Sequence, residues 1–362
     1  MIIFFSIIII LVISVTIFMN GIQFGKAPTG ANLERVLKSP NYKNGAFENS
    51  MSTPMIVTNG KHPSIFKRLF FDKNSPIDSI PSIKTDLKNL DPKQDILVWF
   101  GHSSYFMQID GKKFLVDPVL SGSASPFSFM IKAFKGADIY KPEDMPEIDY
   151  LVITHDHWDH LDYKTVSKIK DRVKNVITPL GVGGNFIYWG FDKNIVTETD
   201  WRDENKFTDG FTLNTTETHH FGGRTFKRNQ SLWVSYVLTT PTMKIYIGGD
   251  SGYGPHFKKI GEKFGPFDLA ILENGQYNEG WKYIHMMPGE NLQAALDLGA
   301  KRLFTVHNSK FVLNVSPWKE PLEKIVELNK KIKIPLITPM IGQQVNLKDN
   351  TEKFTHWWEA VR

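Results

Sequence analysis

The sequence of 362 residues contains no cysteine. This absence excludes a disulfide framework, a thiolate metal ligand and a cysteine nucleophile, so any metal site must be built from histidines and carboxylates. The chain also lacks the Gly-x-Ser-x-Gly pattern of serine hydrolases, which leaves a covalent acyl-enzyme without an evident nucleophile. If the chain is a hydrolase, water is therefore the expected nucleophile.

Blocks of like charge are also missing. The formal net charge is +5 and the sequence pI is about 9.0, but the lysines are scattered and no run of five or more lysines and arginines occurs. Nucleic acid is therefore not expected as a partner. A mildly basic protein is equally suited to an anionic bilayer, which attracts lysines and arginines that lie near the membrane.

The first nineteen residues, Met1 to Met19, carry no charged side chain. Their length and apolar character predict a single-pass transmembrane helix, and residues 1–21 are assigned to this anchor. A cleaved signal peptide is the alternative, but the residues that follow offer no small-x-small cleavage site. The positive-inside tendency would keep the body of the protein cytoplasmic, because basic residues follow the helix: Lys26, Arg35, Lys38 and Lys43.

The rest of the chain divides into an extended segment and one catalytic domain. Residues 22–93 are rich in proline, asparagine, serine and lysine, so they are expected to wrap the core or to link it to the membrane. Residues 94–362 alternate short apolar strands with amphipathic helices. This alternation predicts an α/β domain in which helices cover the sheets.

Individual strands and helices can be placed along this domain. The first hairpin is expected around Asp110-Gly111, a favoured two-residue turn. Strands are expected at residues 96–100, 105–109, 113–116, 150–153, 211–216, 232–238, 244–247, 269–272 and 303–306. Helices are expected at residues 163–173, 255–264, 290–298 and 321–331.

The most informative stretch is the run from His155 to His160, His-Asp-His-Trp-Asp-His, which directly follows the apolar strand at 150–153. The ends of strands in α/β sheets commonly carry functional sites. His155 and His157 can turn toward one ion, while Asp159 and His160 can reach a second ion close by. Packing does not require so many imidazoles after a buried strand, and we therefore interpret the run as a metal-binding motif.

The His-x-His-x-Asp-His motif resembles the signature of the metallo-β-lactamase superfamily. This resemblance implies a four-layer αββα sandwich that holds one or two metal ions at one edge of its paired sheets. It also implies three further ligands on later strand ends. His219 and His220 are the candidates for the first ion, Asp250 is the bridging carboxylate, and His307 is the last ligand of the second ion.

Longer matches resemble one branch of the superfamily, the N-acylphosphatidylethanolamine-hydrolysing phospholipase D-like group, which includes proteins similar to L-ascorbate-6-phosphate lactonase. They extend over roughly Phe24 to Trp318 and comprise Trp99-Phe100-Gly101-His102-Ser103-Ser104, Leu115-Val116-Asp117-Pro118, His220-Phe221-Gly222-Gly223-Arg224, Gly249-Asp250-Ser251-Gly252-Tyr253 and His285-Met286-Met287-Pro288. The pattern Gln-His-Phe of this group assigns the metal ligand to His220 and puts His219 in the place of the glutamine.

Several residues have both a functional and a structural interpretation. His102 either orients a metal ligand or is a buried core residue. Asp117 either supports the ligand loop through hydrogen bonds or ends a strand. His285 either meets the substrate as a proton donor or is an ordinary loop histidine. Arg224 either binds phosphate or makes a surface ion pair. The remaining histidines are interpreted as structural or exposed: His62, His256 and His356.

Together these features predict a metal-dependent hydrolase in which Asp159 and Asp250 orient a metal-bridged hydroxide and His285 acts as the acid. The leading hypothesis is a phospholipase D-like phosphodiesterase that acts on N-acylphosphatidylethanolamine or a related phospholipid. One alternative is a lactonase or other ester hydrolase of a soluble metabolite, and another is a membrane-anchored binding protein with a structural metal site. The ligands suit two zinc ions, and iron or manganese would accept the same set.

Overall fold

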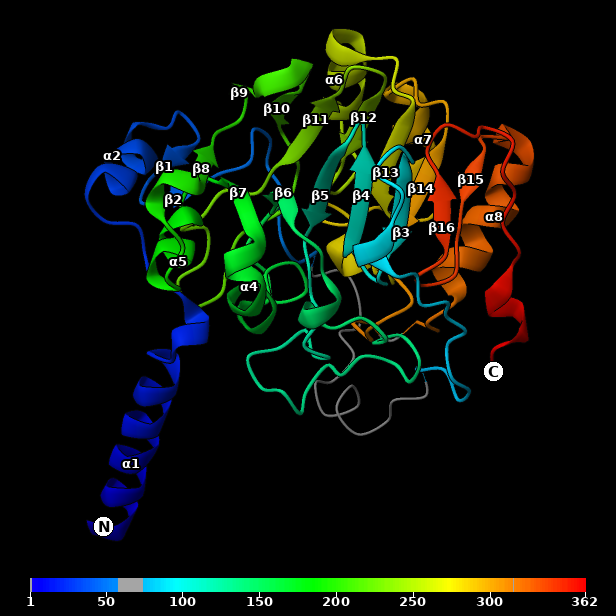
Figure 1. The fold of residues 1–362 in the computed structure, drawn as a ribbon. Coiled ribbons are helices and arrows are strands. Elements are labelled where there is room, and N and C mark those ends of the chain that lie inside the picture. Colours follow the sequence, from blue (N-terminus) through cyan, green and yellow to red (C-terminus); the bar gives the residue numbers. More distant parts are fainter. Residues whose placement is uncertain (1, 58–73, 315) are drawn as a thin grey trace.

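A computed structural model describes residues 2–57, 74–314 and 316–362 of the chain (Figure 1). Seven strands form the first sheet: β3 (Ile96–Trp99), β4 (Tyr105–Ile109), β5 (Lys112–Val116), β6 (Ile148–Val152), β7 (Val173–Pro179), β8 (Val196–Thr199) and β16 (Gln344–Asn346). Seven others form the second: β9 (Glu204–Lys206), β10 (Thr212–Thr216), β11 (Ser235–Thr239), β12 (Lys244–Ile247), β13 (Leu269–Glu273), β14 (Leu303–Val306) and β15 (Leu336–Ile337). Their orders are β16-β3-β4-β5-β6-β7-β8 and β15-β14-β13-β12-β11-β10-β9.

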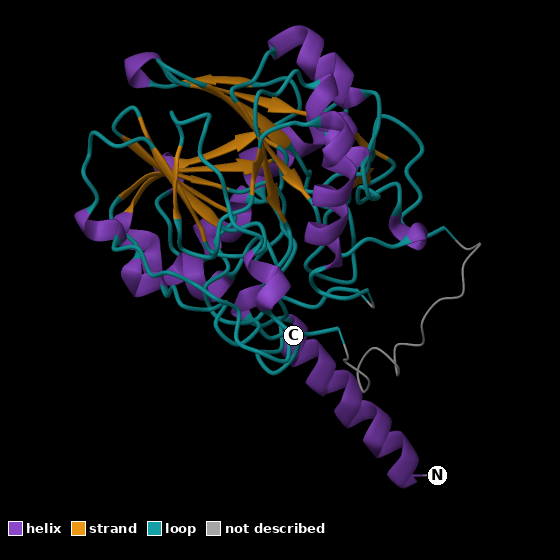
Figure 2. Cartoon of the chain, turned by 90° about the vertical axis from the view of Figure 1, so that its right-hand side faces the viewer, coloured by secondary structure: helices purple, strands orange, loops and turns teal. Residues whose placement is uncertain are grey.

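Helices cover the outer face of each sheet (Figure 2). Helices α4 (Tyr163–Ile169) and α5 (Gly183–Tyr188) lie on the first sheet, where their buried apolar residues share one cluster with residues of β3, β4 and β6. The second sheet is covered by α6 (His256–Phe264), α7 (Glu290–Asp297) and α8 (Glu320–Ile332), which share another cluster with β12, β13 and β14. The predicted α/β sandwich with four layers is therefore confirmed.

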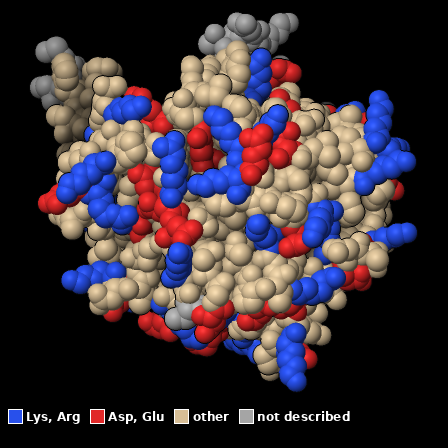
Figure 3. All heavy atoms as spheres, turned by 90° about the horizontal axis from the view of Figure 1, so that it is seen from above, with Lys and Arg blue, Asp and Glu red and all other residues tan. Residues whose placement is uncertain are grey.

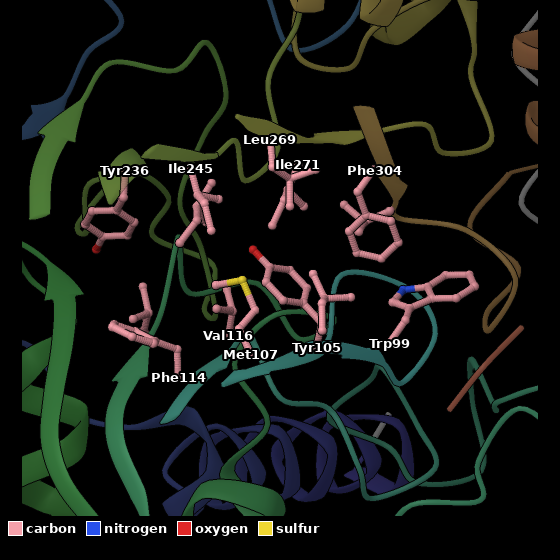
Figure 4. Packing of buried hydrophobic residues seen from close by; sticks show 14 of the residues in the cluster. Trp99, Tyr105, Met107, Phe114, Val116, Tyr236, Ile245, Leu269, Ile271 and Phe304 are labelled. Atoms are coloured by element: carbon pink, nitrogen blue, oxygen red, sulfur yellow. The ribbon is translucent and has the colours of Figure 1, made fainter. Parts of the chain in front are cut away.

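The largest hydrophobic cluster lies between the two sheets (Figure 4). Strand β4 shows how the sequence produces this arrangement. Its side chains alternate between faces, so that Tyr105 and Met107 point toward the second sheet while Phe106 points toward the helices. Both faces of the strand are buried, and a continuous apolar run is the pattern that such a strand requires.

The directions of the strands decide where their ends meet. In the first sheet β3 and β5 both run antiparallel to β4, and β6 runs parallel to β5. In the second sheet β10 and β12 both run antiparallel to β11, and β13 and β14 continue parallel to β12. The carboxyl ends of β3, β5 and β6 therefore share one edge of the first sheet, and those of β10, β12, β13 and β14 share one edge of the second.

Helix α1 (Ile2–Met19) projects away from the sandwich as a separate rod (Figure 1). Its apolar side chains are exposed along most of its length. Within the described ranges of the chain, no helix combines the length and the hydropathy that a membrane span needs. The predicted transmembrane anchor at residues 1–21 is therefore not confirmed.

The segment that follows α1 packs against the sandwich over much of its described length. It contains α2 (Gly30–Lys38) and a small hairpin of β1 (Tyr42–Lys43) and β2 (Ala46–Phe47). Val36 and Phe47 are buried and belong to the cluster between the sheets. The backbone N–H of Phe47 donates to the carbonyl of Asn229 at 2.8 Å. Part of this segment thus completes the core of the domain.

The predicted strand at 232–238 begins later than its apolar pattern indicated. It starts at Ser235, because the preceding residues bond to loops of the other sheet. Leu232 N–H donates to the carbonyl of Leu180, and Val234 N–H donates to the carbonyl of Thr154. These bonds hold the second sheet against the loop that carries the metal motif.

Candidate metal centre

Loops at strand ends of both sheets deliver histidines and carboxylates to one buried site. Each loop follows a strand whose carboxyl end lies at the shared edge of its sheet. The site gathers the residues that the sequence analysis assigned as ligands: His155, His157, Asp159 and His160 after β6, His220 after β10, Asp250 after β12 and His307 after β14. Strands β4 and β11 run antiparallel to both of their neighbours. The neighbours of each therefore end at the same edge, and loops that are far apart in sequence lie close together there.

Three imidazole nitrogens converge in the first cluster. His157 Nδ1 lies 3.0 Å from His155 Nε2 and 3.2 Å from His220 Nε2. Asp250 Oδ2 lies 3.9 Å from His155 Nε2 and 3.8 Å from His220 Nε2. Nitrogens on one tetrahedral zinc ion, each about 2.05 Å from it, would be about 3.3 Å apart. The distances between the nitrogens of this cluster are therefore close to those expected for nitrogens that bind one cation.

The hydrogen bonds behind this cluster fix which nitrogens carry protons. His220 Nδ1 lies 2.9 Å from the carbonyl oxygen of Ile284, which only accepts, so this nitrogen is the donor. His155 Nδ1 lies 3.0 Å from Thr154 Oγ1, whose own proton is donated to Asp117. The Nε2 atoms of the two neutral imidazoles therefore point unshared electron pairs at the same small volume, as metal ligands do.

The second cluster surrounds two carboxylate oxygens. Asp250 Oδ2 lies 2.9 Å from His307 Nε2 and 3.2 Å from His160 Nε2. Asp159 Oδ2 lies 3.5 Å from His307 Nε2 and 3.8 Å from His160 Nε2. Asp250 thus borders both clusters, which is the position of a bridging carboxylate.

The charges of this site call for cations. Burial raises the pKa of Asp250, but His160 and His307 outweigh this effect and hold it well below its usual range. Burial likewise raises the pKa of Asp159, and His160 again outweighs it. Both carboxylates are therefore ionised at neutral pH although they are buried, a state that requires a close countercharge. His160 and His307 supply it in the absence of metal, and divalent cations between these side chains would supply it in their place, so the residues present fit a metal centre.

Asp117 fixes the ring of His160. Its Oδ2 accepts from His160 Nδ1 at 2.8 Å and from the Thr154 hydroxyl at 2.6 Å, and its Oδ1 accepts from the Thr154 N–H at 2.8 Å. This carboxylate makes Nδ1 of His160 the donor and leaves Nε2 for the cluster. Asp117 therefore supports the ligand loop, as the functional interpretation of this residue predicted.

We expect Asp117→Asn to lower metal affinity and turnover by about ten- to a hundredfold, the range typical of residues that hold metal ligands. An asparagine NH2 group must face either the His160 N–H or the Thr154 N–H, and both are donors. Metal titration and turnover measure the effect, and circular dichroism checks the fold. Unchanged metal affinity in the folded variant would contradict the role of Asp117.

His102 contacts a predicted ligand, which favours the orienting role among its two interpretations. Its Nε2 lies 3.0 Å from Asp159 Oδ2. Burial lowers the pKa of His102 to about 3, so the neutral ring donates to the carboxylate from Nε2.

The backbone is left-handed at His102 (φ 54°), Asp117 (φ 41°) and His307 (φ 67°). Such conformations persist only where the surrounding structure enforces them, and here three of them occur in one site.

His285 also lies at the site, together with a carboxylate that the sequence analysis missed. Its Nδ1 is 2.6 Å from Glu273 Oε2, and Glu273 Oε1 accepts from the N–H of Met286 at 2.6 Å. Burial lowers the pKa of His285, but Glu273 outweighs this effect and the pKa is raised. Glu273 follows the predicted strand 269–272 directly, and its place at the carboxyl end of that strand was the available signal.

The predicted surface ion pair of Arg224 is wrong, because the side chain is not on the surface. Its side chain is buried and donates to the carbonyls of Asp156, Leu161 and Gln23. Its guanidinium carbon lies 3.9 Å from the centre of the Trp158 ring. Burial lowers its pKa to about 10, so it stays charged at neutral pH. Arg224 thus hydrogen-bonds to both ends of the metal-binding loop, at Asp156 and at Leu161.

The other histidines lie outside the two clusters. His219 points away from them, with its Nε2 3.2 Å from Glu217 Oε1 and its ring against that of His256. His256 is buried and lies 3.1 Å from the hydroxyl of Ser251. His356 is exposed and pairs with Glu359. His62 lies outside the described residues.

With this geometry established, comparison with known proteins identifies the family. The family model of the beta-lactamase superfamily domain matches residues 112–308, more than half of the chain. The chain belongs to the metallo-β-lactamase superfamily. It is accordingly a metal-dependent hydrolase of that superfamily, and the family match covers the run from His155 to His160 as well as His220, Asp250 and His307.

Relatives place the chain near the phospholipase D-like branch. An uncharacterised protein of Mycobacterium tuberculosis is 33% identical over 328 residues, which cover 89% of this chain and 88% of that protein. The N-acyl-phosphatidylethanolamine-hydrolyzing phospholipase D 1 of Caenorhabditis elegans is 31% identical over 248 residues, 64% of this chain and 68% of that protein. The metallo hydrolase Igni18 of Ignicoccus hospitalis has the same fold, with a TM-score of 0.54 at 18% identity over 70% of this chain and 98% of that one.

Proposed function

We propose that the protein is a binuclear metal-dependent phosphodiesterase that cleaves a membrane phospholipid in the manner of phospholipase D. The observation that carries the proposal is the pair of buried ligand clusters, with Asp250 Oδ2 within 3.9 Å of histidine nitrogens in both. His155, His157 and His220 would hold one ion. The second ion would be held by Asp159, His160 and His307. N-acylphosphatidylethanolamine is the proposed substrate, since a relative that cleaves it is 31% identical.

When bound, two divalent ions lower the pKa of a water molecule toward neutrality and neutralise charge on phosphoryl oxygens. The residues of the chain supply the rest of the reaction. Asp159 and Asp250 orient the attacking water by accepting its hydrogen bonds, and the proton that the water loses passes to solvent. As the new P–O bond forms, the P–O bond to the leaving alkoxide breaks, and that alkoxide takes a proton.

His285 is positioned to give this proton. Its side chain is part-buried at the site, and the Glu273 carboxylate keeps its pKa above the ordinary value. A raised pKa keeps the ring protonated over more of the neutral pH range, which suits a general acid. Nδ1 is held by Glu273 at 2.6 Å, so Nε2 is the nitrogen that would face the leaving group.

A substrate screen tests this function against its alternatives. The full chain, loaded with metal, is assayed on bis-p-nitrophenyl phosphate, vesicles of N-acylphosphatidylethanolamine, acyl-homoserine lactones and β-lactams. Release of the N-acylethanolamine headgroup supports the proposal. Turnover of lactones alone would favour the lactonase alternative, and binding of metal with no turnover of any substrate would favour a structural site.

Elemental analysis of protein purified without added metal tests the choice of ions. Two zinc ions per chain are proposed, because imidazole and carboxylate ligands suit zinc in hydrolases. The mixed nitrogen and oxygen set would also accept iron or manganese. A metal content of about two equivalents, lost on chelation together with activity, supports the binuclear centre.

We also propose that α1 attaches the enzyme to the membrane that contains its substrate, with the catalytic domain on the cytoplasmic side. The exposed apolar side chains of α1 support the attachment. The lysines and arginine that follow α1, beginning with Lys26, support this orientation. On the face shown in Figure 3, acidic and basic side chains are interspersed.

Removal of α1 is expected to separate the two activities. A chain that begins at Asn20 keeps the Gln23 carbonyl that Arg224 binds. It should cleave bis-p-nitrophenyl phosphate at the full rate, because every proposed ligand lies after Asp95. On vesicles below saturation it should be about a hundredfold slower, because tethering raises the effective substrate concentration. High salt should not cause the same loss of vesicle activity in the full chain, because salt does not screen attachment through apolar side chains. Equal rates on vesicles would contradict the role of α1.

A further inference from the structure

An apolar loop lies against the base of α1. It belongs to the long connection between β5 and β6, which extends from the sandwich on the same side as α1 (Figures 1 and 2). Phe127 and Phe129 of this loop are 38% and 70% exposed. The ring of Phe18 in α1 stacks on that of Phe127, with ring centres 4.4 Å apart and planes 7° from parallel. Helix and loop therefore form one continuous apolar surface.

The helical part of this surface is apolar on all sides. Ile3, Leu11, Val12 and Ile13 are 77%, 61%, 57% and 52% exposed. At about 100° per residue these four side chains point in directions spread around the whole circumference. A groove on a partner protein covers only one stripe of a helix, whereas a helix that is apolar all round needs an apolar environment on every side. Lipid provides that environment.

The charged residues that border the surface are cationic. The part of the β5–β6 connection that carries the two rings, residues 119–137, contains Lys132 and Lys135, both exposed, and the acidic residues of the connection lie outside this part, at Asp117 and from Asp138 onward. Lys26, also exposed, is the first charged residue after α1. Lysines beside apolar side chains are favoured at a bilayer surface, where their charges meet anionic headgroups while their stems remain in the apolar layer.

Aromatic contacts link this surface to the metal-binding motif. The ring of Phe18 lies 5.2 Å from that of Phe24, and Phe24 lies 5.2 Å from Trp158. Trp158 stands in the sequence between the proposed ligands His157 and Asp159. A bilayer that met the apolar surface would therefore lie on the side of the domain that carries the metal centre.

We propose that Phe127 and Phe129 form a second membrane contact beside α1 and that this contact turns the metal centre toward the bilayer. The occupant of the surface is the apolar layer of an anionic bilayer. The inference deepens the proposed function, because it names the face through which a lipid substrate would approach. Membrane contact by the loop is nevertheless a physical event that can be measured without any hydrolysis.

Site-directed labelling tests the contact in the full chain. The chain has no cysteine, so Phe129→Cys provides a single site for an environment-sensitive fluorophore. Leu296→Cys is the control, because this residue is 49% exposed on α7, a helix over the second sheet. Both labelled variants are bound to vesicles of phosphatidylcholine and phosphatidylglycerol. The vesicles also contain a lipid that carries a nitroxide on its acyl chain. Position 129 should be quenched by the nitroxide lipid, and position 296 by aqueous iodide alone.

Two results would overturn the proposal. If iodide quenches position 129 as strongly as position 296, the loop lies in water. If neither quencher reaches position 129, the surface is covered by protein, and a second copy of the chain detected by cross-linking would be its occupant. Neither result depends on the substrate, so failure of the lipid hydrolase assignment remains a separate finding.

A kinetic comparison tests the orienting role. The double variant Phe127→Ser with Phe129→Ser should cleave bis-p-nitrophenyl phosphate at the rate of the parent chain, because neither ring lies in the metal centre. Hydrolysis of vesicle lipid should fall by about tenfold or more, as expected when apolar insertion is lost at two positions. Leu296→Ser should change neither rate. Equal vesicle rates for the double variant and its parent would refute the orienting role.

Discussion

Replacement of Asp159 or His157 by alanine is expected to abolish hydrolysis and to remove at least part of the bound metal while the fold stays assembled. Asp159 places one oxygen within 3.5 Å of His307 and 3.8 Å of His160, and His157 places one nitrogen between those of His155 and His220. Loss of a proposed ligand should exceed the ten- to hundredfold effect typical of residues behind the ligands. The fold should survive, because the hydrophobic clusters of the domain include neither side chain.

Turnover, elemental analysis and circular dichroism measure this outcome together. His356→Ala is the matched control, because this exposed histidine pairs with Glu359 and lies outside the metal clusters. Its metal content and turnover should equal those of the parent chain. A folded Asp159→Ala or His157→Ala variant with parental turnover would refute the proposed metal centre.

The adjacent histidines after β10 should differ sharply in their sensitivity. His220→Gln should lose metal and activity, because an amide replaces the imidazole nitrogen whose free electron pair converges with those of His155 and His157. His219→Gln should be tolerated, since its ring points toward Glu217 and His256 instead. Glutamine is the residue that the resembling group carries at this position. The two variants change the same residue type to the same size at neighbouring positions, and each is thus a control for the other.

Metal content and turnover of both variants decide the assignment. If His219→Gln loses metal while His220→Gln keeps it, the assigned register is wrong by one residue. A one-residue shift exchanges side chains that point inward with those that point outward. Only one of the two histidines can therefore be the metal ligand.

Much of the fold could be predicted from local patterns. The strand Ile96–Trp99 and the first four residues of the strand Leu269–Glu273 are continuous apolar runs, because each is buried between helices and the opposite sheet. The turn at Asp110-Gly111 was recognisable because both residues adopt positive φ angles, which aspartate and glycine tolerate well. The edge strand Gln344–Asn346 was missed, since its three residues carry too few apolar side chains to show a pattern.

The interactions that cross the molecule could not be read from the sequence. Asn49 accepts from the indole N–H of Trp233 and donates to the carbonyl of His220, so the N-terminal segment helps to hold a proposed ligand. Glu273 meets His285 across a loop of a dozen residues. No periodicity or motif records such pairs, because their partners meet only after the two sheets have packed.

The sequence by itself determined the chemistry of the site. The absence of cysteine limits the ligands to histidine and carboxylate. The run from His155 to His160 places four of these ligands within six consecutive residues. Only the tertiary structure decided which neighbours face the site. It turned His220 inward and His219 outward, buried Arg224 as a clamp, and placed Asp250 between two clusters. The physical reason is that side-chain direction depends on strand register and sheet packing, which join residues that are distant in the chain.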